Sequence, residues 1–468
     1  MDPDKIKRRQ SLKIIISEAV MVVSVVITVI VLAFLVSGYW INSDFKVERQ
    51  GLLQISSTPT GADVDIDGDS SWLQRTNTSK VLSAGKHTIT LTKDGYDSWS
   101  RTINISEGLL YRLHYPRLFL QNTTAEEILD IDTTAFHSFS PDGNKLLSIN
   151  NLTTWELVEL SDNVVKTTNL DVSPLFLGYL AQVPDAVNFG EVLSLDWSQD
   201  NNHALLSIQI GSTTEWILLD TRNAEKSVNL TNSLGYTLSQ VQILDHSAST
   251  LLAIVDGSLH KIDVSSRSLS PAFAQDVTSY SLFGADEVVF SAADTESDAD
   301  GDYYIGKLKL NDEKVTKFMN TAMPVQAVVS KFYDDKYLTV LQDNAVSLYL
   351  YSTLDKKSEY RLGFAPTNIK VGNDGSFTSF YSGAQIASLD MEAESVAEWA
   401  TDSAEFGWID GSIIYSVDAQ GGLAVYDFDG LNRRVIADNA THHAATITAD
   451  KWLYYFSDNH LMRKLIAD

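Results

Sequence analysis

Cysteine is absent from the 468-residue sequence. Its absence excludes disulfide bridges, thiolate zinc sites and cysteine nucleophiles, but it fits exported and cytosolic proteins equally and assigns no compartment. Basic residues are also few, since 35 Lys and Arg stand against 61 Asp and Glu, a net charge of −26. Nucleic acid phosphates attract clusters of Lys and Arg, so we expect no nucleic acid partner.

Several catalytic motifs are absent as well. The chain contains no Gly-x-Ser-x-Gly elbow, no His-Glu-x-x-His pair and no Gly-x-Gly-x-x-Gly loop. We therefore predict no catalytic residues and no cofactor-binding residues. With this many acids, a carboxylate pair for glycoside hydrolysis could still form by folding alone, so a glycan-active enzyme stays open as an alternative.

One long apolar run stands near the N-terminus, and no second run approaches its length. Residues Ala19 to Ser43 carry no charge, and about 20 apolar residues of helix cross a bilayer. The basic residues before the run are Lys5, Lys7, Arg8, Arg9 and Lys13. By the positive-inside rule, the N-terminus is cytoplasmic and the rest lies outside. The sequence predicts a cytoplasmic tail over 1–13, a single-pass transmembrane helix over 14–41 and a linker over 42–50.

A cleaved signal peptide is the alternative interpretation of this run, with Val36-Ser37-Gly38 as a weak cleavage site. The apolar region of a signal peptide is normally about 7–15 residues long. The run here is longer, which favours an uncleaved anchor.

Residues 51–118 alternate apolar and polar residues in short segments, with turn residues such as Asp67-Gly68 between them. A period of two over five short segments predicts a small β-sandwich. The predicted strands contain Leu53 and Ile55, Val64 and Ile66, Ile89 and Leu91, Ile103 and Ile105, and Leu109, Tyr111 and Leu113.

This unit resembles a known family. The stretch GLLQISSTPTGADVDIDG over residues 51–68 resembles the opening of a PEGA domain, and LSAGKHTITL from residue 82 resembles its second half. The Pro-Glu-Gly-Ala that names the family appears as Pro59-Thr60-Gly61-Ala62, and a different loop over residues 70–79 replaces the usual Gly-x-Thr-Pro. The resemblance implies a small extracytoplasmic β-module of prokaryotic envelope proteins, without known catalysis.

In the remainder, residues 119–468, an apolar strand, a polar turn and a buried strand recur at intervals of roughly 35–55 residues. This pattern is typical of a β-propeller. We favour eight blades. Seven stay open, because residues 171–191 are either a long insertion or part of a blade. A strand near residues 128–131 would complete the last blade. The segment SFSPDGNKLL from Ser138 resembles the repeat of Tol-associated and WD-type propellers, which marks a fold and no particular function. A helical turn is predicted only over residues 392–399.

An acidic cluster gives the one metal candidate. Glu296, Asp298, Asp300 and Asp302 alternate along a glycine-containing segment, and such oxygens suit Ca²⁺. The twelfth position of an EF-type loop from Glu296 is Lys307 instead of Glu, and the alternative is a solvated hairpin loop within one blade. Asp63, Asp65 and Asp67 form a similar pattern, which a half-buried strand explains.

The predicted fold class is therefore all-β with one N-terminal transmembrane helix, a PEGA-like β-sandwich and a seven- or eight-bladed β-propeller. The predicted function is a membrane-anchored extracytoplasmic envelope protein, a non-catalytic binding or scaffolding module. Its expected partners are the membrane, through the N-terminal helix, and an envelope protein, peptide or cell-wall glycan. The alternatives are an extracytoplasmic glycan-active enzyme and a self-assembling surface-layer component.

Overall fold

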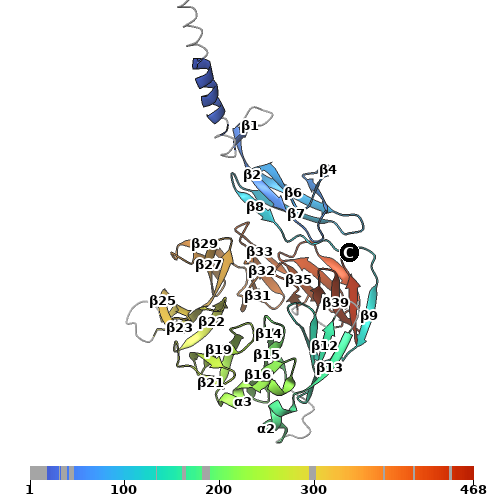
Figure 1. Ribbon diagram of the computed structural model, residues 1–468, viewed down its shortest axis with the longest axis vertical. Helices are drawn as coiled ribbons and strands as arrows, with labels where there is room; N and C mark the ends of the chain where they lie inside the picture. The colour runs from blue at the N-terminus through green and yellow to red at the C-terminus, as the bar shows by residue number, and fades with distance from the viewer. Residues whose placement is uncertain are drawn as a thin grey trace, which may run out of the picture. The chain divides into compact units, whose positions relative to one another are not determined.

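The computed structural model describes residues 18–30, 32, 39–41, 47–132, 134–160, 165–181, 190–294, 302–372, 375–403, 406–441 and 445–468. The chain divides into two compact units, Met1–Gln121 and Asn122–Asp468. Both units are built almost entirely from strands (Figure 1).

A helix over residues 18–30 precedes the strands of the first unit. Its apolar side chains are exposed, with Val20 at 62% and Met21 at 63%. Within the described part of the chain, no helix is both long and apolar enough to cross a membrane. Strand β1 (Tyr39–Ile41) pairs antiparallel with the start of β2 (Val47–Ile55), where the sequence pattern predicted the end of a helix and a linker. Pairing with Val47 to Arg49 gives the three residues of β1 a backbone partner that a helix end lacks.

The rest of the first unit consists of two four-stranded sheets. In one, β2 lies between β5 (Thr78–Ser83) and β8 (Leu110–Leu113) and also pairs with β1. In the other, the order is β4 (Asp69–Arg75), β3 (Asp63–Ile66), β6 (Gly85–Thr92) and β7 (Trp99–Ile105). The alternation of the sequence places one face of each sheet in a shared core, whose fully buried side chains include Leu53, Ile55, Ile89, Leu91 and Trp99. This confirms the predicted strands and the β-sandwich.

The prediction of a loop over residues 70–79 is wrong. These residues hold most of β4 and the first two residues of β5. A tight hairpin explains the difference, because Asp67 (φ 57°) and Gly68 (φ 85°) both adopt the left-handed region that a type I′ turn requires. The turn folds β4 back onto β3, where Asp69 pairs with Ile66.

The described residues of the second unit form eight four-stranded antiparallel sheets, seven of which have their strands in sequence order. Blade 1 consists of β10 (Phe136–Phe139), β11 (Lys145–Ile149), β12 (Thr154–Leu160) and β13 (Val165–Asp171). Blade 2 consists of β14 (Val192–Trp197), β15 (His203–Ile210), β16 (Thr213–Asp220) and β17 (Val228–Asn229). Blade 3 consists of β18 (Leu238–Ile243), β19 (Thr250–Val255), β20 (Ser258–Asp263) and β21 (Ser268–Leu269), and blade 4 of β22 (Val277–Phe283), β23 (Glu287–Ala293), β24 (Tyr303–Lys309) and β25 (Lys314–Thr321).

Blades 5 to 7 follow the same plan. They are β26 (Gln326–Phe332), β27 (Asp335–Gln342), β28 (Ala345–Leu350) and β29 (Lys356–Arg361); β30 (Asn368–Val371), β31 (Phe377–Ser382), β32 (Gln385–Asp390) and β33 (Ser395–Ala400); and β34 (Phe406–Trp408), β35 (Ile413–Val417), β36 (Leu423–Asp427) and β37 (Arg434–Ala437). Figure 1 shows the blades in a ring, with the first strands β14 and β22 on the inner side of their blades.

Blade 8 closes the ring with strands from both ends of the unit. It combines β38 (Thr446–Thr448), β39 (Trp452–Ser457) and β40 (His460–Leu465) with β9 (Ala125–Asp130). Leu461 pairs with Leu129 in this seam, and the Arg463 guanidinium lies 2.9 Å from the Glu126 carboxylate. The predicted closing strand is confirmed, and the propeller has eight blades instead of seven.

The connection between blades 1 and 2 adds no strand in its described part. It contains a 3-10 helix, η1 (Ser173–Phe176), and a single turn of helix, α2 (Leu177–Leu180). Phe176 packs into the core between the two blades. Residues 172–181 of this segment form no strand of a blade, which agrees with the first of the two alternatives that the sequence left open, a long insertion. Two further short helices, η2 (Ala224–Lys226) and α3 (Leu230–Leu234), flank β17 in blade 2.

Apolar interfaces join neighbouring blades from blade 1 to blade 6 and join blade 8 to blade 1. Leu147 and Trp155 of blade 1 pack with Leu206 and Ile217 of blade 2, for example. Burial of both faces by neighbours is what a ring of blades provides and an isolated blade lacks. One interior position shows how tight the packing is: a Cβ atom on Gly306 would lie 2.2 Å from the ring of Phe290, its cross-strand partner.

The predicted helical turn over residues 392–399 is wrong. Its residues form the hairpin turn before β33 and most of β33 itself. The Trp399 indole donates a hydrogen bond to the Phe428 carbonyl of blade 7 at 3.0 Å. The residues form a strand because they pair with β32 and because the Trp399 side chain is hydrogen-bonded to blade 7. These tertiary contacts outweigh the local helical pattern of the sequence.

Candidate functional site

A polar turn between first and second strands recurs in blades 1 and 2. The Ser140 hydroxyl donates to Asp142 at 2.6 Å, and the Ser198 hydroxyl donates to Asp200 at 2.6 Å. Each serine also accepts a backbone N–H from the start of the second strand. The SFSPDGNKLL segment and the stretch that follows Trp197 therefore form the same turn. The two turns lie at the same end of the ring, because each follows the first strand of its blade.

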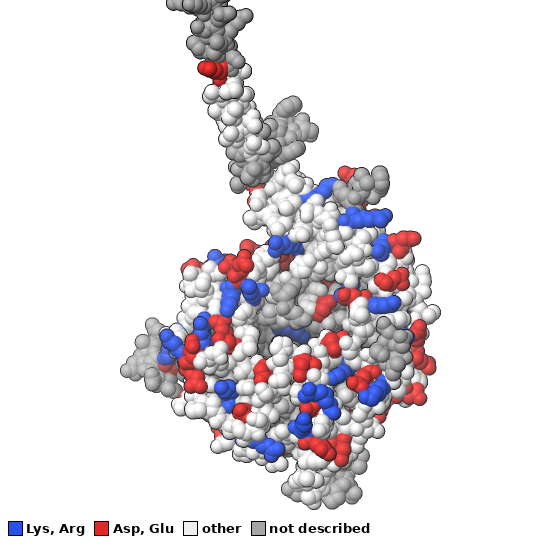
Figure 2. Space-filling view, viewed as in Figure 1, with Lys and Arg blue, Asp and Glu red and all other residues white. Residues whose placement is uncertain are grey.

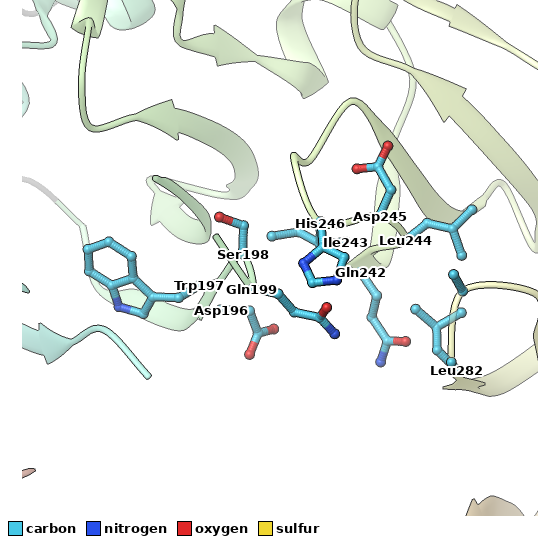
Figure 3. Close-up of a pocket in the computed structure, with 12 residues that line it drawn as sticks. Asp196, Trp197, Ser198, Gln199, Gln242, Ile243, Leu244, Asp245, His246 and Leu282 are labelled. Atoms are coloured by element: carbon cyan, nitrogen blue, oxygen red, sulfur yellow. The ribbon is translucent and has the colours of Figure 1, made fainter. Parts of the chain in front are cut away.

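A cavity of about 560 Å³ opens at this end. It is formed by the last residues of the first strands of blades 2, 3 and 4 and by the turns that follow them. In Figure 3 the side chains of Asp196, Gln199 and Gln242 point toward the same open space. The lining comprises Asp196, Trp197, Ser198, Gln199, Gln242, Ile243, Leu244, Asp245, His246, Leu282, Gly284 and Ala285.

Asp196 is the exceptional residue of this lining. It retains accessible surface, because it faces the hollow of the ring, yet the surrounding blades displace bulk water from it. Burial raises the pKa of the Asp196 carboxyl, and the charge of Lys370 partly offsets that rise. No hydrogen bond or ion pair to Asp196 is found among the described residues. Asp245, by contrast, accepts hydrogen bonds from the Ser249 amide and hydroxyl.

Lys370 stands on the opposite side of the ring. It belongs to the first strand of blade 6, and three blades separate it from blade 2 in either direction. Burial lowers the pKa of Lys370, and attraction to Asp196 partly offsets that effect. Its ammonium lies 4.7 Å from the centroid of the Trp408 ring, which favours the cation by electrostatic attraction.

Trp408 is held in an aromatic group on blades 6 and 7. Its ring centroid lies 5.0 Å from those of Tyr381 and Phe406. All three side chains are half-buried, and burial raises the pKa of the Tyr381 hydroxyl. The group fixes the surface on which the Lys370 ammonium rests.

The centre of the ring differs in charge from the rest of the chain. As far as the structure describes them, the eight first strands contain only Asp196, Lys331 and Lys370 as charged residues, an excess of positive charge within a chain of net charge −26. Figure 2 shows the ring hollowed at its centre and surrounded by acidic and basic side chains. The cavity lining has the opposite balance, because it carries Asp196 and Asp245 and, among the described residues, no Lys or Arg.

The predicted calcium ligands Glu296, Asp298 and Asp300 lie outside the described residues. Asp302 is described, and its carbonyl accepts the Asp294 amide at 2.8 Å. The cluster connects β23 and β24, whose ends pair at Ala293 and Tyr303, as the hairpin alternative requires. Within the described ranges, no three His, Asp or Glu side chains are grouped to hold a metal ion, so Ca²⁺ binding stays a prediction.

Asp63 and Asp65 lie on strand β3, as predicted, and Asp67 begins the turn that follows it. Val64 and Ile66 between them are buried. Asp63 pairs with Arg75 at 3.0 Å, and Asp67 contacts the His87 ring at 2.6 Å. A backbone hydrogen bond from Thr88, followed by the contact with His87, lowers the pKa of Asp67. The carboxylates are thus used within the sandwich.

A second candidate surface lies on the sandwich. Leu52 pairs with Val81 on one side and with Leu110 on the other, so three aliphatic side chains form a row across one sheet. They are 39%, 57% and 38% exposed, respectively. The row is short, and scattered exposed aliphatic residues are ordinary on soluble surfaces.

Sequence reasoning did not identify Asp196, Lys370 or Trp408. They lie far apart in the chain and belong to no motif. Only the ring brings them together, because the first strands of all blades meet at its centre. A charged residue in an otherwise neutral first strand is the signal that could have marked the first two.

Comparison with known proteins identifies a family for the first unit. Residues 50–117 match the PEGA domain family, which confirms the resemblance seen in the sequence. No curated protein matches the chain. The C-terminal WD40 domain of Sif2 is similar in structure at 13% identity, with 74% of this chain and 98% of that chain covered and a TM-score of 0.48. BamB from Moraxella catarrhalis is similar at 12% identity, with coverage of 74% and 100% and a TM-score of 0.44. A third similar structure is the dihydro-heme d1 dehydrogenase NirN in complex with DHE, at 13% identity, coverage of 65% and 66% and a TM-score of 0.42.

Proposed function

We propose that this PEGA domain and its eight-bladed propeller form a membrane-anchored binding protein of a prokaryotic envelope, with the propeller outside the cytoplasm. The ligand is an envelope protein, a peptide or a cell-wall glycan, and it occupies the centre of the ring. One observation carries the proposal: a 560 Å³ cavity into which uncommitted polar side chains converge, at the end of the ring where the first strands finish. Largely preformed cavities with a few convergent polar groups are typical of binding sites.

The proposed location rests on the N-terminal sequence. An uncharged run from Ala19 to Ser43 follows a basic tail, which favours an anchor with a cytoplasmic N-terminus. Protease treatment of intact cells that carry a C-terminal epitope tag tests this. We expect loss of the tag with retention of an N-terminal fragment in the membrane. A tag that survives until the cells are lysed would refute the extracytoplasmic location.

The binding function is tested by retention of envelope material. The full-length chain in detergent is immobilised and exposed separately to solubilised envelope proteins and to cell-wall polymer fragments. We expect one of the two fractions to be retained, and Asp196→Leu, which blocks the cavity with an apolar side chain, to release it. If neither fraction is retained, the binding proposal fails.

A glycan-active enzyme is the second candidate, because the raised pKa of Asp196 is what a general acid needs. Paired-carboxylate hydrolysis requires a second carboxylate about 5–9 Å away. Asp245 also lines the cavity, but it accepts two hydrogen bonds from Ser249 and points away from Asp196 in Figure 3, which supports binding over hydrolysis. Release of reducing ends from cell-wall polymer by wild type, and none by Asp196→Asn, would favour the enzyme instead.

A further inference from the structure

Two side chains of opposite charge face the centre of the ring without forming an ion pair in the described structure. Asp196 on β14 and Lys370 on β30 belong to opposite blades, and no direct ion pair joins them in the described structure. Lys370 is exposed toward the hollow, and its described contact is the Trp408 ring at 4.7 Å. An ammonium held against an aromatic face, with no carboxylate bound to it, is available to an anionic group of a ligand.

The charge balance favours an anion. Lys331 and Lys370 outnumber Asp196 in the described first strands, whereas acidic residues outnumber basic ones in the whole chain. The net acidic chain repels an anionic polymer, and at the centre of the ring the attraction for an anion comes from the lysines, with Lys370 held on Trp408. This arrangement selects for a ligand whose negative charge is local, such as one carboxylate, because a densely charged polyanion would meet the acidic rim first.

The lining beside Asp196 favours hydroxyl groups. The amides of Gln199 and Gln242 point with the Asp196 carboxylate into the same space (Figure 3). Each amide offers two N–H donors and one acceptor, and the carboxylate offers acceptors. Neighbouring hydroxyl groups of a sugar both donate and accept, so they satisfy such a mixed set.

The backbone disfavours an extended peptide. A peptide that adds as a strand needs a regular edge, and the first strands of blades 2, 3 and 4 each carry a register shift, between Val192 and Ser194, Ser239 and Val241, and Val277 and Ser279. Gln240, within the second shift, has φ of 47°, and its amide donates to the Tyr280 carbonyl at 2.7 Å. Bulges of this kind interrupt edge pairing.

We propose that the ring centre binds a carboxylated sugar, a uronic acid unit of a glycan, with the Lys370 ammonium on Trp408 pairing with the carboxylate and with Asp196, Gln199 and Gln242 hydrogen-bonding the hydroxyl groups. This proposal rests on the proposed binding function and names its ligand class. Lys370 sets the preference for acidic over neutral sugar. Asp196 accepts from hydroxyl groups and repels a carboxylate that is placed in the wrong orientation.

Isothermal titration of the full-length chain in detergent tests the proposal. The probes are a tetrasaccharide that contains glucuronate, the same tetrasaccharide with its carboxyl groups reduced to alcohols, and an acidic peptide of equal charge. We expect the acidic sugar to bind tightest. Lys370→Gln should weaken it about tenfold, since a hydrogen bond to a charged group is of that order, and should leave the reduced sugar unchanged. Lys370→Arg should retain the preference for acid.

Lys314→Gln is the matched control, because Lys314 lies on β25, an outer strand, and is exposed. It removes the same charge and should change no affinity. Equal binding of acidic and reduced sugars, or equal effects of Lys314→Gln and Lys370→Gln, would overturn the proposal. Binding of the peptide alone would overturn the ligand class and leave the proposed binding function standing. Failure of all three probes, while the chain still retains envelope material, would also refute the uronate site, whereas failure of retention itself refutes the proposed function.

Discussion

The sandwich and the propeller bury the apolar faces of their sheets in different ways. The sandwich buries one face of each of two sheets in a single core around Trp99 and Leu53. The propeller has no single core, because each blade buries its faces against two neighbours, and the ring is closed by one seam between β9 and β40. Stability is therefore concentrated in the sandwich and distributed in the ring, where the centre is left open for a ligand.

The largest effect is expected from the core of the sandwich. Trp99 is fully buried and packs edge-to-face with Tyr115 at 6.0 Å. Trp99→Ala should cost about 3–5 kcal/mol, a large part of the stability of so small a unit. Calorimetry of the full-length chain should show the sandwich transition lowered or lost and the ring transition unchanged.

Trp155→Ala is the corresponding substitution in the ring, to be compared with Trp99→Ala in the sandwich. Trp155 is equally buried, but it lies between blades 1 and 2. This variant should lower only the ring transition. If either substitution moved a single shared transition, the two units would be one cooperative structure, and the contrast between them would be lost.

The seam is the second test. Leu461 is fully buried where β40 meets blade 1. Leu461→Ala should cost about 2–5 kcal/mol and should accelerate hydrogen exchange in β9, because β9 is the one strand that reaches its blade from the other end of the unit. Mass spectrometry of peptides that cover residues 122–131 measures the rate.

Leu252→Ala, in the interface between blades 3 and 4, removes the same atoms from an ordinary interface. Its cost in stability should be similar, and exchange in β9 should stay slow. Equal acceleration of β9 by both variants would show that the seam is no weaker than any other contact of the ring.

A smaller effect is expected from overpacking one blade. A Cβ atom on Gly306 would lie 2.2 Å from the Phe290 ring, and overpacking of this kind costs about 1–3 kcal/mol. Gly306→Ala should lower the ring transition by that amount, and Phe290→Leu in the same chain should restore part of it. Gly178→Ala, where no atom lies within 4 Å of the added Cβ, should cause no loss. A Gly306→Ala chain as stable as wild type would contradict the packing described for blade 4.

The smallest effect concerns the charge at the centre of the ring. Burial raises the folded-state pKa of Asp196 above its ordinary value of 3.8, so ionisation is less favourable in the folded chain than in the unfolded one. The stability contributed by protonated Asp196 is present below pH 3.8 and is lost as the pH rises through the raised pKa. Asp196→Asn should therefore unfold at higher denaturant concentration than wild type at pH 7, with the difference vanishing at low pH.

Asp263 in blade 3 is the control of opposite sign. Hydrogen bonds from the Ser266 amide and the Ser265 hydroxyl hold its pKa at about 2. Its contribution is present above the ordinary pKa and is lost as the pH falls through about 2. Asp263→Asn should therefore be less stable than wild type at pH 7. The same sign of change for both variants would contradict the electrostatic contrast between the centre of the ring and its periphery.

Local patterns in the sequence were enough to predict most of the architecture. Alternation around Leu53 and Val64 placed the strands of the sandwich, and the repeated turn at Asp142 and Asp200 placed the blades. They were not enough for the hairpin at residues 67–70, where the positive φ angles of Asp67 and Gly68 set a tighter turn than the family pattern implied. They also failed for residues 392–399, where the anchor of Trp399 in the next blade decided the conformation.

The candidate site depended on ring closure, which no local pattern contains. Asp196 and Lys370 face the same ring centre only because blades 2 and 6 stand opposite each other. That arrangement depends on the number of blades. The acidic residues from Glu296 to Asp302 are close together in the sequence, so they could be recognised as a candidate metal site without knowledge of the fold. Glu296 itself lies outside the described residues.

Hydrogen exchange of the full-length chain, with and without its retained envelope ligand, distinguishes binding at the centre of the ring from binding on the sandwich, since it reports on both units at once. We expect slower exchange in β14, β18 and β30, whose residues meet at the centre of the ring, and unchanged exchange in the sandwich. Protection confined to β2, β5 and β8, beneath the exposed row of Leu52, Val81 and Leu110, would place binding on the sandwich and contradict it.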